Sequence, residues 1–425
     1  MSGLTIAERS DTGSQTRTIR VALAGCGVVG GHLAALLREH GVAIERSRGI
    51  RIELVRVLVR DVQRPRPTPL APHILTADAE SFLATPADVV IEALGGHDPA
   101  ERIAWSTLAA GRDYITANKL VVARRGEELR DLARRSRARF SFEAAVAGGV
   151  PVLRVLRDAL VGDDVRAVRG VLNGTTNYIL SRLHEGTTFS TALTDAQASG
   201  FAEADPSRDL DGRDAADKIA ILAWIAFGTD PARLRVHRAG LLPDPEALIA
   251  AARTFGGVVR LIAECVRLPG AAIASVEPVL VRPGSRFAAV HGADNLVEID
   301  SAWSGALRFS GAGAGGAPTA TALLGDILAS PSPLSAPHSR ACPDAHDPRP
   351  RRWVLSVRCT DRRSLIDACA AAGLTGAGVH ADRRTGTLHV LTERCLRTDV
   401  ARAAALLRAR HEAVIESRYD LEEDS

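Results

Sequence analysis

Lysine is almost absent from this chain of 425 residues. Among its 53 basic side chains only Lys119 and Lys218 are lysines, and the remaining 51 are arginines. Arginine stays protonated in proteins, whereas a lysine can lose its proton when it is desolvated. Both retained lysines lie beside motif-like segments, so the composition predicts that they take part in catalysis. Replacing either by arginine is expected to lower kcat with little change in thermal stability.

Other features that the sequence lacks exclude several classes of protein. The six cysteines are scattered without a CxxC pair or metal-like spacing to histidine, which predicts reduced thiols in a cytoplasmic protein. No apolar run is long enough to span a bilayer, and residues 1–17 have no hydrophobic signal core. The formal net charge is only +3, which gives no reason to expect nucleic-acid or membrane binding.

A glycine-rich turn follows the first strand that the sequence predicts. Gly25, Gly27 and Gly30 form a G-x-G-x-x-G motif between a β-branched strand and an amphipathic helix, with Val28 and Val29 inside the motif. This context favours a dinucleotide whose pyrophosphate lies on the helix N-terminus. The alternative is a βα turn without a ligand.

Later segments continue the pattern of a parallel sheet that binds a nucleotide. The predicted strand 50–61 ends in Arg60 and Asp61, so Arg60 could hold a 2′-phosphate and Asp61 a free ribose hydroxyl. Neither NADP nor NAD is excluded. The buried strand 87–96 ends in a glycine turn that contains Gly95, and a strand over 112–123 is expected to carry Lys119, before a helix over 127–137.

The segment 200–227 gathers acidic side chains around Lys218 and then becomes apolar. Asp211 occupies the expected N-cap of a helix, and Asp214 falls in the first turn, where the helix dipole favours a carboxylate. Asp214 and Lys218 are then one turn apart on the same helix face. A charged pair on a core helix is costly unless something polar lies above it. The alternative is a helix cap with a solvated ion pair.

Two further segments leave alternatives open. Residues 143–150, in an expected strand over 139–152, are small, so their carbonyl groups could coordinate a hard cation, or the segment could form a close helix–sheet crossing. An acylating semialdehyde dehydrogenase would need a cysteine nucleophile at a strand-to-helix turn outside the cofactor loop. Cys26 lies inside that loop and Cys265 in an expected helix. A nucleotide sensor without activity is disfavoured by the intact lysines and carboxylates.

Taken in order, several segments resemble the homoserine dehydrogenase family over nearly the whole of residues 18–329. They are AGCGVVG, DVVIEALGGHDPA, ITANK, EAAVAGGVP, GVLNGTTNYIL, GFAEADPSRDLDGRDAADKIAILA and GAGAGGAPTATALLGDIL. The resemblance implies NAD(P)-dependent interconversion of L-aspartate 4-semialdehyde and L-homoserine, in threonine, methionine and isoleucine biosynthesis. No kinase-sized segment precedes the nucleotide-binding part, as in the monofunctional form.

The resemblance also implies roles for individual residues. The residues expected to be catalytic are Lys119, Lys218 and Asp214. Those expected to bind the substrate are Glu203, Asp209, Asp214, Asn118, Gly174 and Thr175. Those expected to bind the cofactor are Gly25, Gly27, Val28, Val29, Gly30, Arg60, Gly95, Thr116, Lys119 and Gly174. A sodium or potassium ion is expected on backbone oxygens of Glu143, Val146, Gly148 and Val150.

The expected fold class is α/β with three parts. A disordered tail (1–17) precedes a Rossmann dinucleotide-binding domain (18–150, completed by 310–329), and an α+β substrate-binding and dimerisation domain (151–329) follows. A Pro/Ser-rich linker (330–351) leads to residues 352–425, whose β-α-β-β-α-β pattern is ferredoxin-like. The partner is expected to be a small-molecule substrate, and the protein a homodimer or homotetramer.

The C-terminal part resembles the ACT regulatory module in pattern only. The turn after its first strand reads Asp361-Arg362-Arg363-Ser364 instead of the family's Asp-x-Pro-Gly. This departure predicts that threonine inhibits weakly or not at all. The exposed edge of such a sheet predicts a role in self-association.

Overall fold

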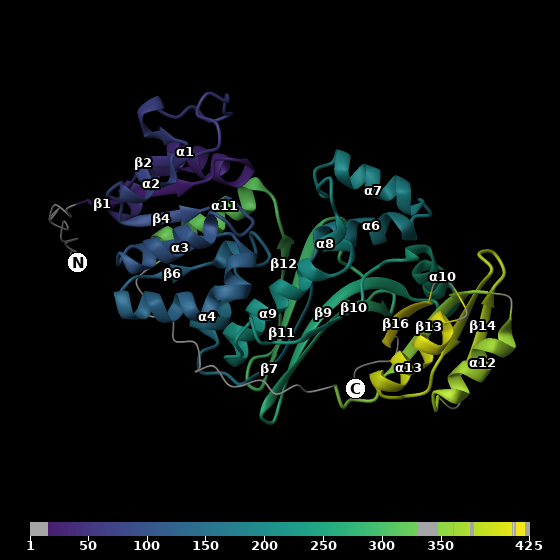
Figure 1. Cartoon of the computed structure of the whole chain (residues 1–425). Coiled ribbons are helices and arrows are strands. Elements are labelled where there is room, and N and C mark those ends of the chain that lie inside the picture. Colours follow the sequence, from purple (N-terminus) through teal and green to yellow (C-terminus); the bar gives the residue numbers. More distant parts are fainter. Residues whose placement is uncertain are drawn as a thin grey trace, which may run out of the picture.

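Two β-sheets and the helices packed on them make up the part of the chain that the structure describes (Figure 1). The computed structural model describes residues 16–329, 347–359, 361–374, 378–409, 411 and 414–420. The predicted N-terminal tail, apart from residues 16 and 17, and residues 330–346 of the predicted linker lie outside these ranges. No helix within these ranges is long and apolar enough to cross a membrane.

The first sheet is parallel and has the strand order β3-β2-β1-β4-β5-β6. Its central strands are short runs of fully buried apolar residues such as Val21 and Ile91, as expected when helices cover both faces. Strand β1 lies between β2 and β4, so the chain order reverses there and leaves a crevice at the carboxyl ends of the strands. The strands are β1 (Arg17–Ala24), β2 (Ile50–Leu58), β3 (Leu75–Thr76), β4 (Val89–Glu92), β5 (Asp113–Thr116) and β6 (Phe140–Ser141).

The helices of this sheet are α1 (Val28–Arg48), α2 (Ala79–Ala84), α3 (Ala100–Ala109) and α4 (Lys119–Ser136). A late helix, α11 (Gly316–Leu328), returns from the second sheet and packs against α1 (Figure 1). Helix α11 lies within residues 310–329, the segment that we expected to complete the nucleotide-binding part.

The second sheet is mainly antiparallel, and its first part has the order β12-β11-β7-β9-β10. Helix α9 (Arg213–Phe227), the apolar helix that follows the acidic segment, packs against β7, β9 and β10. The strands are β7 (Val165–Val171), β8 (Val236–Arg238), β9 (Val258–Leu268), β10 (Ala271–Val281), β11 (Asp294–Ser301) and β12 (Gly305–Ala312). The other helices are α5 (Val152–Arg154), α6 (Gly174–His184), α7 (Phe189–Ala198), α8 (Ser207–Leu210) and α10 (Pro245–Phe255).

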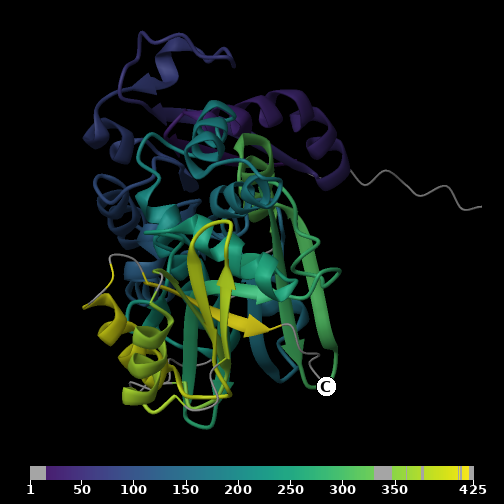
Figure 2. The same ribbon diagram turned by 90° about the vertical axis from the view of Figure 1, so that its right-hand side faces the viewer.

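The C-terminal part has the expected β-α-β-β-α-β order and lies at the far end of the molecule from the first sheet (Figures 1 and 2). Its last strand pairs in parallel with β10, with Val279 opposite Arg418, so the second sheet continues through it. One edge of the C-terminal sheet is therefore covered within the chain. The elements are β13 (Arg352–Arg358), α12 (Arg362–Ala371), β14 (Gly378–Asp382), β15 (Thr387–Leu391), α13 (Arg397–Arg408) and β16 (Val414–Asp420).

Buried ion pairs hold this junction together. Arg418 of β16 is paired with Glu264 of β9 at 2.7 Å and with Glu277 of β10 at 3.2 Å, and all three side chains are almost completely buried. Arg349 adds a second ion pair to Glu264 at 3.0 Å. Because removing one partner of a buried ion pair leaves an uncompensated charge, these contacts tie the C-terminal part to β9 and β10.

The expected strand around Lys119 is wrong, since β5 ends at Thr116 and Lys119 is the first residue of helix α4. Asn118 ends the strand because its side-chain oxygen accepts hydrogen bonds from the N–H groups of Leu120 and Val121, at 3.1 and 3.4 Å. The helix therefore begins eight residues before the predicted start of 127. The strand expected over 139–152 is also wrong: β6 has two residues, and short helical turns follow.

Two other local expectations are wrong. Gly212, not Asp211, precedes the first residue of α9, and it has the left-handed conformation with φ of 80°. Asp211 still contributes, because its carboxylate accepts a hydrogen bond from the N–H group of Arg213 at 3.0 Å. Cys265 lies in strand β9, with no helix around it, and is fully buried.

Candidate active site

The glycine turn after β1 is built so that backbone comes close to the crevice. A Cβ atom at Gly25 would lie 2.6 Å from the carbonyl oxygen of Ala93, and one at Gly30 would lie 2.0 Å from the oxygen of Gly25. No atom lies within 4 Å of the corresponding position at Gly27, and Val28 is 70% exposed. The N-terminus of α1 is therefore open to an anion, and the turn fits the pyrophosphate of a dinucleotide.

Glu92, a residue that the sequence analysis missed, organises the ends of β4 and β5. Its side chain is fully buried and accepts hydrogen bonds from Thr116 Oγ1 at 2.6 Å and from the N–H group of Gly95 at 3.1 Å. The Asn118 side chain joins the two loops by donating to the oxygen of Gly96 at 2.8 Å. An acidic residue at the end of the apolar run VVIE was the available signal.

The two lysines meet at one carboxylate. Asp214 lies 2.9 Å from Nζ of Lys119 through Oδ1 and 2.7 Å from Nζ of Lys218 through Oδ2. The ammonium group of Lys218 also donates to the oxygen of Leu172 at 2.7 Å. The Lys119 side chain is 34% exposed, whereas those of Lys218 and Asp214 are 9% and 7% exposed. Lys119 is thus the accessible member of the pair.

The charges of this cluster determine its protonation. Burial alone would raise the pKa of Asp214, but the ammonium groups of Lys218 and Lys119 lower it well below its usual range. Asp214 in turn raises the pKa of Lys119, against the opposing effect of burial. The pKa of Asp209 is raised, first by burial and then by the charge of Asp214. Lys119 is therefore held as an ammonium ion that can donate a proton.

Asn173, which the sequence analysis did not single out, connects the two carboxylates. Its Nδ2 donates to Asp209 Oδ1 at 2.7 Å and to Asp214 Oδ2 at 2.8 Å. Its Oδ1 accepts from the N–H group of Thr176 at 2.8 Å and so caps α6. One buried amide therefore fixes the positions of Asp209 and Asp214.

A close helix crossing brings Lys119 to Asp214. Helices α4 and α9 pack together where a Cβ atom at Gly126 would lie 2.7 Å from the Trp224 ring. That ring stacks on Phe142, with 5.4 Å between the ring centroids. Because a larger residue at position 126 would separate the helices, the crossing holds the two lysine-bearing N-termini together.

The remaining predicted substrate residues are placed less uniformly. Thr175 Oγ1 donates to the oxygen of Phe201 at 2.5 Å, and a Cβ at Gly174 would lie 2.6 Å from the oxygen of Ala293, so both residues pack against neighbouring chain. Glu203 is exposed, and in the described part of the chain no hydrogen bond or ion pair holds its carboxylate. The structure thus brings together the side chains of Lys119, Lys218, Asp214 and Asp209 and the loop that contains Asn118. The Glu203 carboxylate lies apart from this group.

The segment expected to hold a cation shows close packing. Ala147 and Gly148 have φ angles of 54° and 51°, and a Cβ at Gly148 would lie 2.8 Å from Gly313 backbone. The oxygen of Val150 already accepts a hydrogen bond from Val152 at 2.8 Å. This contact joins two segments outside helices and strands, so it is not the helix–sheet crossing that the sequence left open. No group of three or more His, Cys, Asp or Glu in the described ranges could hold a metal.

Asp61 and Arg60 follow β2 and are the two candidates to contact the ribose of a bound cofactor. Asp61 Oδ1 accepts a hydrogen bond from the N–H group of Gln63 at 2.8 Å, within its own loop. Arg60 is exposed. Arg66 donates to the oxygen of Asp61 at 2.6 Å, and its charge opposes the effect of burial, which raises the pKa of Cys26 in the glycine turn.

A parallel sheet with a glycine turn at its crevice, beside a lysine pair bridged by a carboxylate, defines an NAD(P)-dependent oxidoreductase of a small polar substrate. Family models agree with this class. The model described as the NAD binding domain of homoserine dehydrogenase matches residues 25–143, and the one described as homoserine dehydrogenase matches residues 151–328. The chain belongs to the homoserine dehydrogenase family.

Known relatives match over most of the chain. The homoserine dehydrogenase of Corynebacterium glutamicum is 33% identical, over 92% of this chain and 93% of that relative. That of Synechocystis sp. is 38% identical, over 73% of both chains. A solved homoserine dehydrogenase from Thiobacillus denitrificans superposes with a TM-score of 0.81 at 30% identity, covering 95% of this chain and 99% of that one.

A hyperthermophilic archaeal homoserine dehydrogenase in complex with NADPH superposes with a TM-score of 0.62 at 25% identity. It matches 73% of this chain and 97% of its own. The activity is accordingly the NAD(P)-dependent interconversion of L-aspartate 4-semialdehyde and L-homoserine.

Proposed function

We propose that Lys119 is the proton donor and acceptor at the substrate oxygen, and that Lys218 and Asp214 hold it in place. The observation that carries this assignment is the shared carboxylate, with one lysine accessible and the other buried. The nicotinamide supplies or accepts the hydride when it is bound. During carbonyl reduction, the raised pKa of Lys119 keeps a proton ready for the oxygen that develops negative charge.

Substrate binding uses the carboxylates beside this pair. Asp209 is half-buried, fixed by Asn173, and turned toward the lysine cluster, which suits an anchor for the substrate ammonium. Glu203 is a second anchor that becomes engaged only when substrate is present, because its carboxylate is exposed. Asn118 and Thr116 shape the floor, since Thr116 Oγ1 accepts from the N–H group of Asn118 at 2.9 Å.

The test is homoserine oxidation by the purified full chain, with NAD⁺ and NADP⁺ compared side by side. Lys119→Met is expected to abolish turnover while leaving cofactor binding measurable by fluorescence. Arg125→Met, an exposed position on the same helix, is the matched control and is expected to behave as wild type. Wild-type turnover in Lys119→Met would overturn the assignment.

NADP(H) is accepted at least as well as NAD(H) under this proposal. Its support is that the Asp61 carboxylate is engaged within its own loop, whereas Arg60 is exposed at the end of β2. A 2′-phosphate would meet the cation of Arg60 there, while the second oxygen of the Asp61 carboxylate stays available to a free ribose hydroxyl.

Three further proposals accompany the activity. A sodium or potassium ion on the carbonyl groups of residues 143–150 is supported by the consecutive left-handed residues Ala147 and Gly148, which redirect the backbone oxygens. Replacing both cations by tetramethylammonium should then lower Tm.

Self-association as a homodimer or homotetramer is supported by β12, which ends the second sheet and has alternating exposed residues. A cytoplasmic location is supported by free thiols at Cys26, Cys265, Cys359, Cys369 and Cys395.

We also propose that the chain divides at the boundaries expected from the sequence, with residues 352–425 as a C-terminal module whose last strand continues the second sheet. Asp361 supports the view that the effector turn is altered. Its carboxylate accepts hydrogen bonds from the N–H groups of Arg363 and Ser364, at 3.0 and 3.1 Å, and so caps helix α12. We therefore keep the expectation that threonine inhibits weakly or not at all, which a threonine titration of the full-length protein tests.

A further inference from the structure

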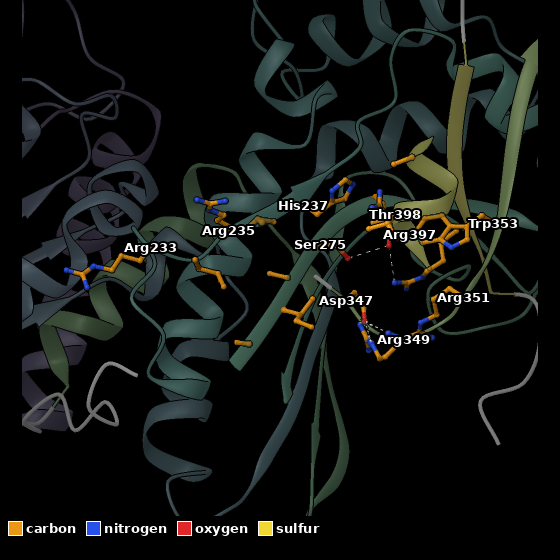
Figure 3. A pocket seen from close by; sticks show the side chains of 18 residues that line it. Arg233, Arg235, His237, Ser275, Asp347, Arg349, Arg351, Trp353, Arg397 and Thr398 are labelled. Atoms are coloured by element: carbon orange, nitrogen blue, oxygen red, sulfur yellow. Dashed lines mark hydrogen bonds and ion pairs between the residues drawn. The ribbon is translucent and has the colours of Figure 1, made fainter. Parts of the chain in front are cut away.

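We call strands β7–β12 of the second sheet the catalytic sheet. A cavity of about 500 Å³ lies where this catalytic sheet meets the C-terminal part (Figure 3). Its walls come from β8 and β10 on one side and from β13, α13 and β16 on the other, together with residues 347–351. None of the residues assigned to the active site lines it. The volume is that of a small-metabolite site.

Arginine dominates the wall of this cavity. Six arginines line it but only two carboxylates, those of Glu277 and Asp347. Most of the arginines are within ion-pair distance of these carboxylates or of Glu264 behind the wall, and Arg351 has the longest of these contacts. The arginines are Arg233, Arg235, Arg349, Arg351, Arg397 and Arg418.

Several hydrogen-bond donors in the wall are buried without an acceptor. Within the described residues, Nε and Nη2 of Arg397, Nε of Arg351 and Nε1 of Trp353 have no partner. Trp353 is only 3% exposed, and the Arg397 guanidinium lies over its ring at 4.6 Å from the centroid. Buried donors are rarely left unpaired in folded proteins. The described residues therefore provide no acceptor for these four donors.

Arg351 also lacks a close counter-charge. Its nearest carboxylate among its ion pairs is Glu264, at 3.8 Å, and Glu264 is already shared with Arg349 and Arg418. Burial lowers the pKa of Arg351, and the neighbouring charge of Arg418 lowers it further. Figure 3 shows Arg351, Arg397 and Trp353 together on one side of the cavity, whereas Arg233 extends away from them.

We propose that this cavity is a binding site for a small dianion, held by the guanidinium groups of Arg351 and Arg397 and by the indole N–H group of Trp353. A phosphate monoester and a dicarboxylate share the required chemistry, which is two negative charges and several acceptor oxygens. Either would place a counter-charge beside these guanidinium groups, between β10 and the C-terminal part.

Isothermal titration of the full-length protein with inorganic phosphate, and separately with malonate, tests the proposal. Chloride at matched ionic strength is the background. At least one of the two anions is expected to bind once per chain, to change Trp353 fluorescence and to raise Tm, since a ligand that binds only the folded state stabilises it. The anion that binds more tightly identifies the source of the dianion.

Arg397→Gln and Arg351→Gln are each expected to weaken this binding at least about tenfold, as loss of a charged hydrogen bond does. Two variants are needed because Arg397 also pairs with Glu277, and its loss could affect folding. Arg233→Gln, whose side chain is 79% exposed, is the matched control and should bind as wild type does. The proposal is overturned if neither anion binds at millimolar concentration, or if both cavity variants bind as tightly as wild type.

Discussion

The burial of Lys218 makes the two lysines respond differently to the same substitution. Lys218 is 9% exposed, and its ammonium group lies 2.7 Å from both Leu172 O and Asp214 Oδ2. The longer and wider guanidinium of Lys218→Arg cannot occupy this space without displacing neighbours, which costs about 1–3 kcal/mol. The corresponding fall in Tm is roughly 2–10 °C for a large domain. Lys119→Arg, at a side chain 34% exposed, should leave Tm unchanged.

Both variants should lose activity, because arginine cannot exchange its proton and the ammonium geometry is lost. The expected fall in kcat for Lys119→Arg is about 10²–10⁴, the usual contribution of general acid–base catalysis. Thermal unfolding monitored by circular dichroism and initial rates of homoserine oxidation separate the two effects. A Lys218→Arg protein that unfolds at the wild-type temperature and turns over normally would refute the role assigned to the buried ammonium group.

Three other expectations follow from particular contacts. Asn173→Ala should lower kcat/KM about tenfold to a hundredfold, because hydrogen bonds to charged groups contribute about 1.5–3 kcal/mol; unchanged homoserine kinetics would contradict the role of Asn173 in holding Asp209 and Asp214. Arg60→Ala should weaken NADP⁺ binding selectively in a fluorescence titration, and equal losses for NAD⁺ would show that Arg60 does not meet the 2′-phosphate. Burial lowers the pKa of the fully buried His389 to about 4, although the charge of Asp382 opposes it; His380 adds a smaller lowering effect. The unfolded chain then binds more protons between pH 6.5 and 4, so stability is present above pH 6.5 and falls by up to roughly 3 kcal/mol on acidification. Denaturant titrations of His389→Gln should show a shallower fall over this range, and an identical fall would exclude His389 as its source.

The sequence was most informative about features whose residues are close together along the chain. The glycine turn, the one-turn spacing of Asp214 and Lys218, and the scarcity of lysine each pointed to a feature that the structure places at the active site. These signals depend on a helix or turn that short-range interactions define. The family resemblance then supplied the reaction, which the comparisons confirm.

Features that depend on tertiary contact were not predictable in the same way. Lys119 was placed in a strand because its neighbours Tyr114, Ile115 and Val121 have β propensity, yet the Asn118 cap ends the strand first. The bridging of both lysines by one carboxylate required the crossing of α4 and α9 at Gly126, which joins residues about a hundred positions apart. Tertiary packing also made the buried Lys218 unlike Lys119, a difference that composition could not show.

The pairing of β16 with β10 has a consequence for the order in which the protein can fold as it is synthesised. Glu264 and Glu277 are buried in the middle of the chain, but three arginines paired with them, Arg349, Arg397 and Arg418, come from its C-terminal part. Domains usually fold as they leave the ribosome, from the N-terminus onward. Here the nucleotide-binding sheet can form early, whereas most of the arginines that pair with Glu264 and Glu277 emerge only with residues 349–418. Completion of the second sheet therefore follows synthesis of the C-terminal part, and a chain that stops before residue 349 would retain two carboxylates without these arginines.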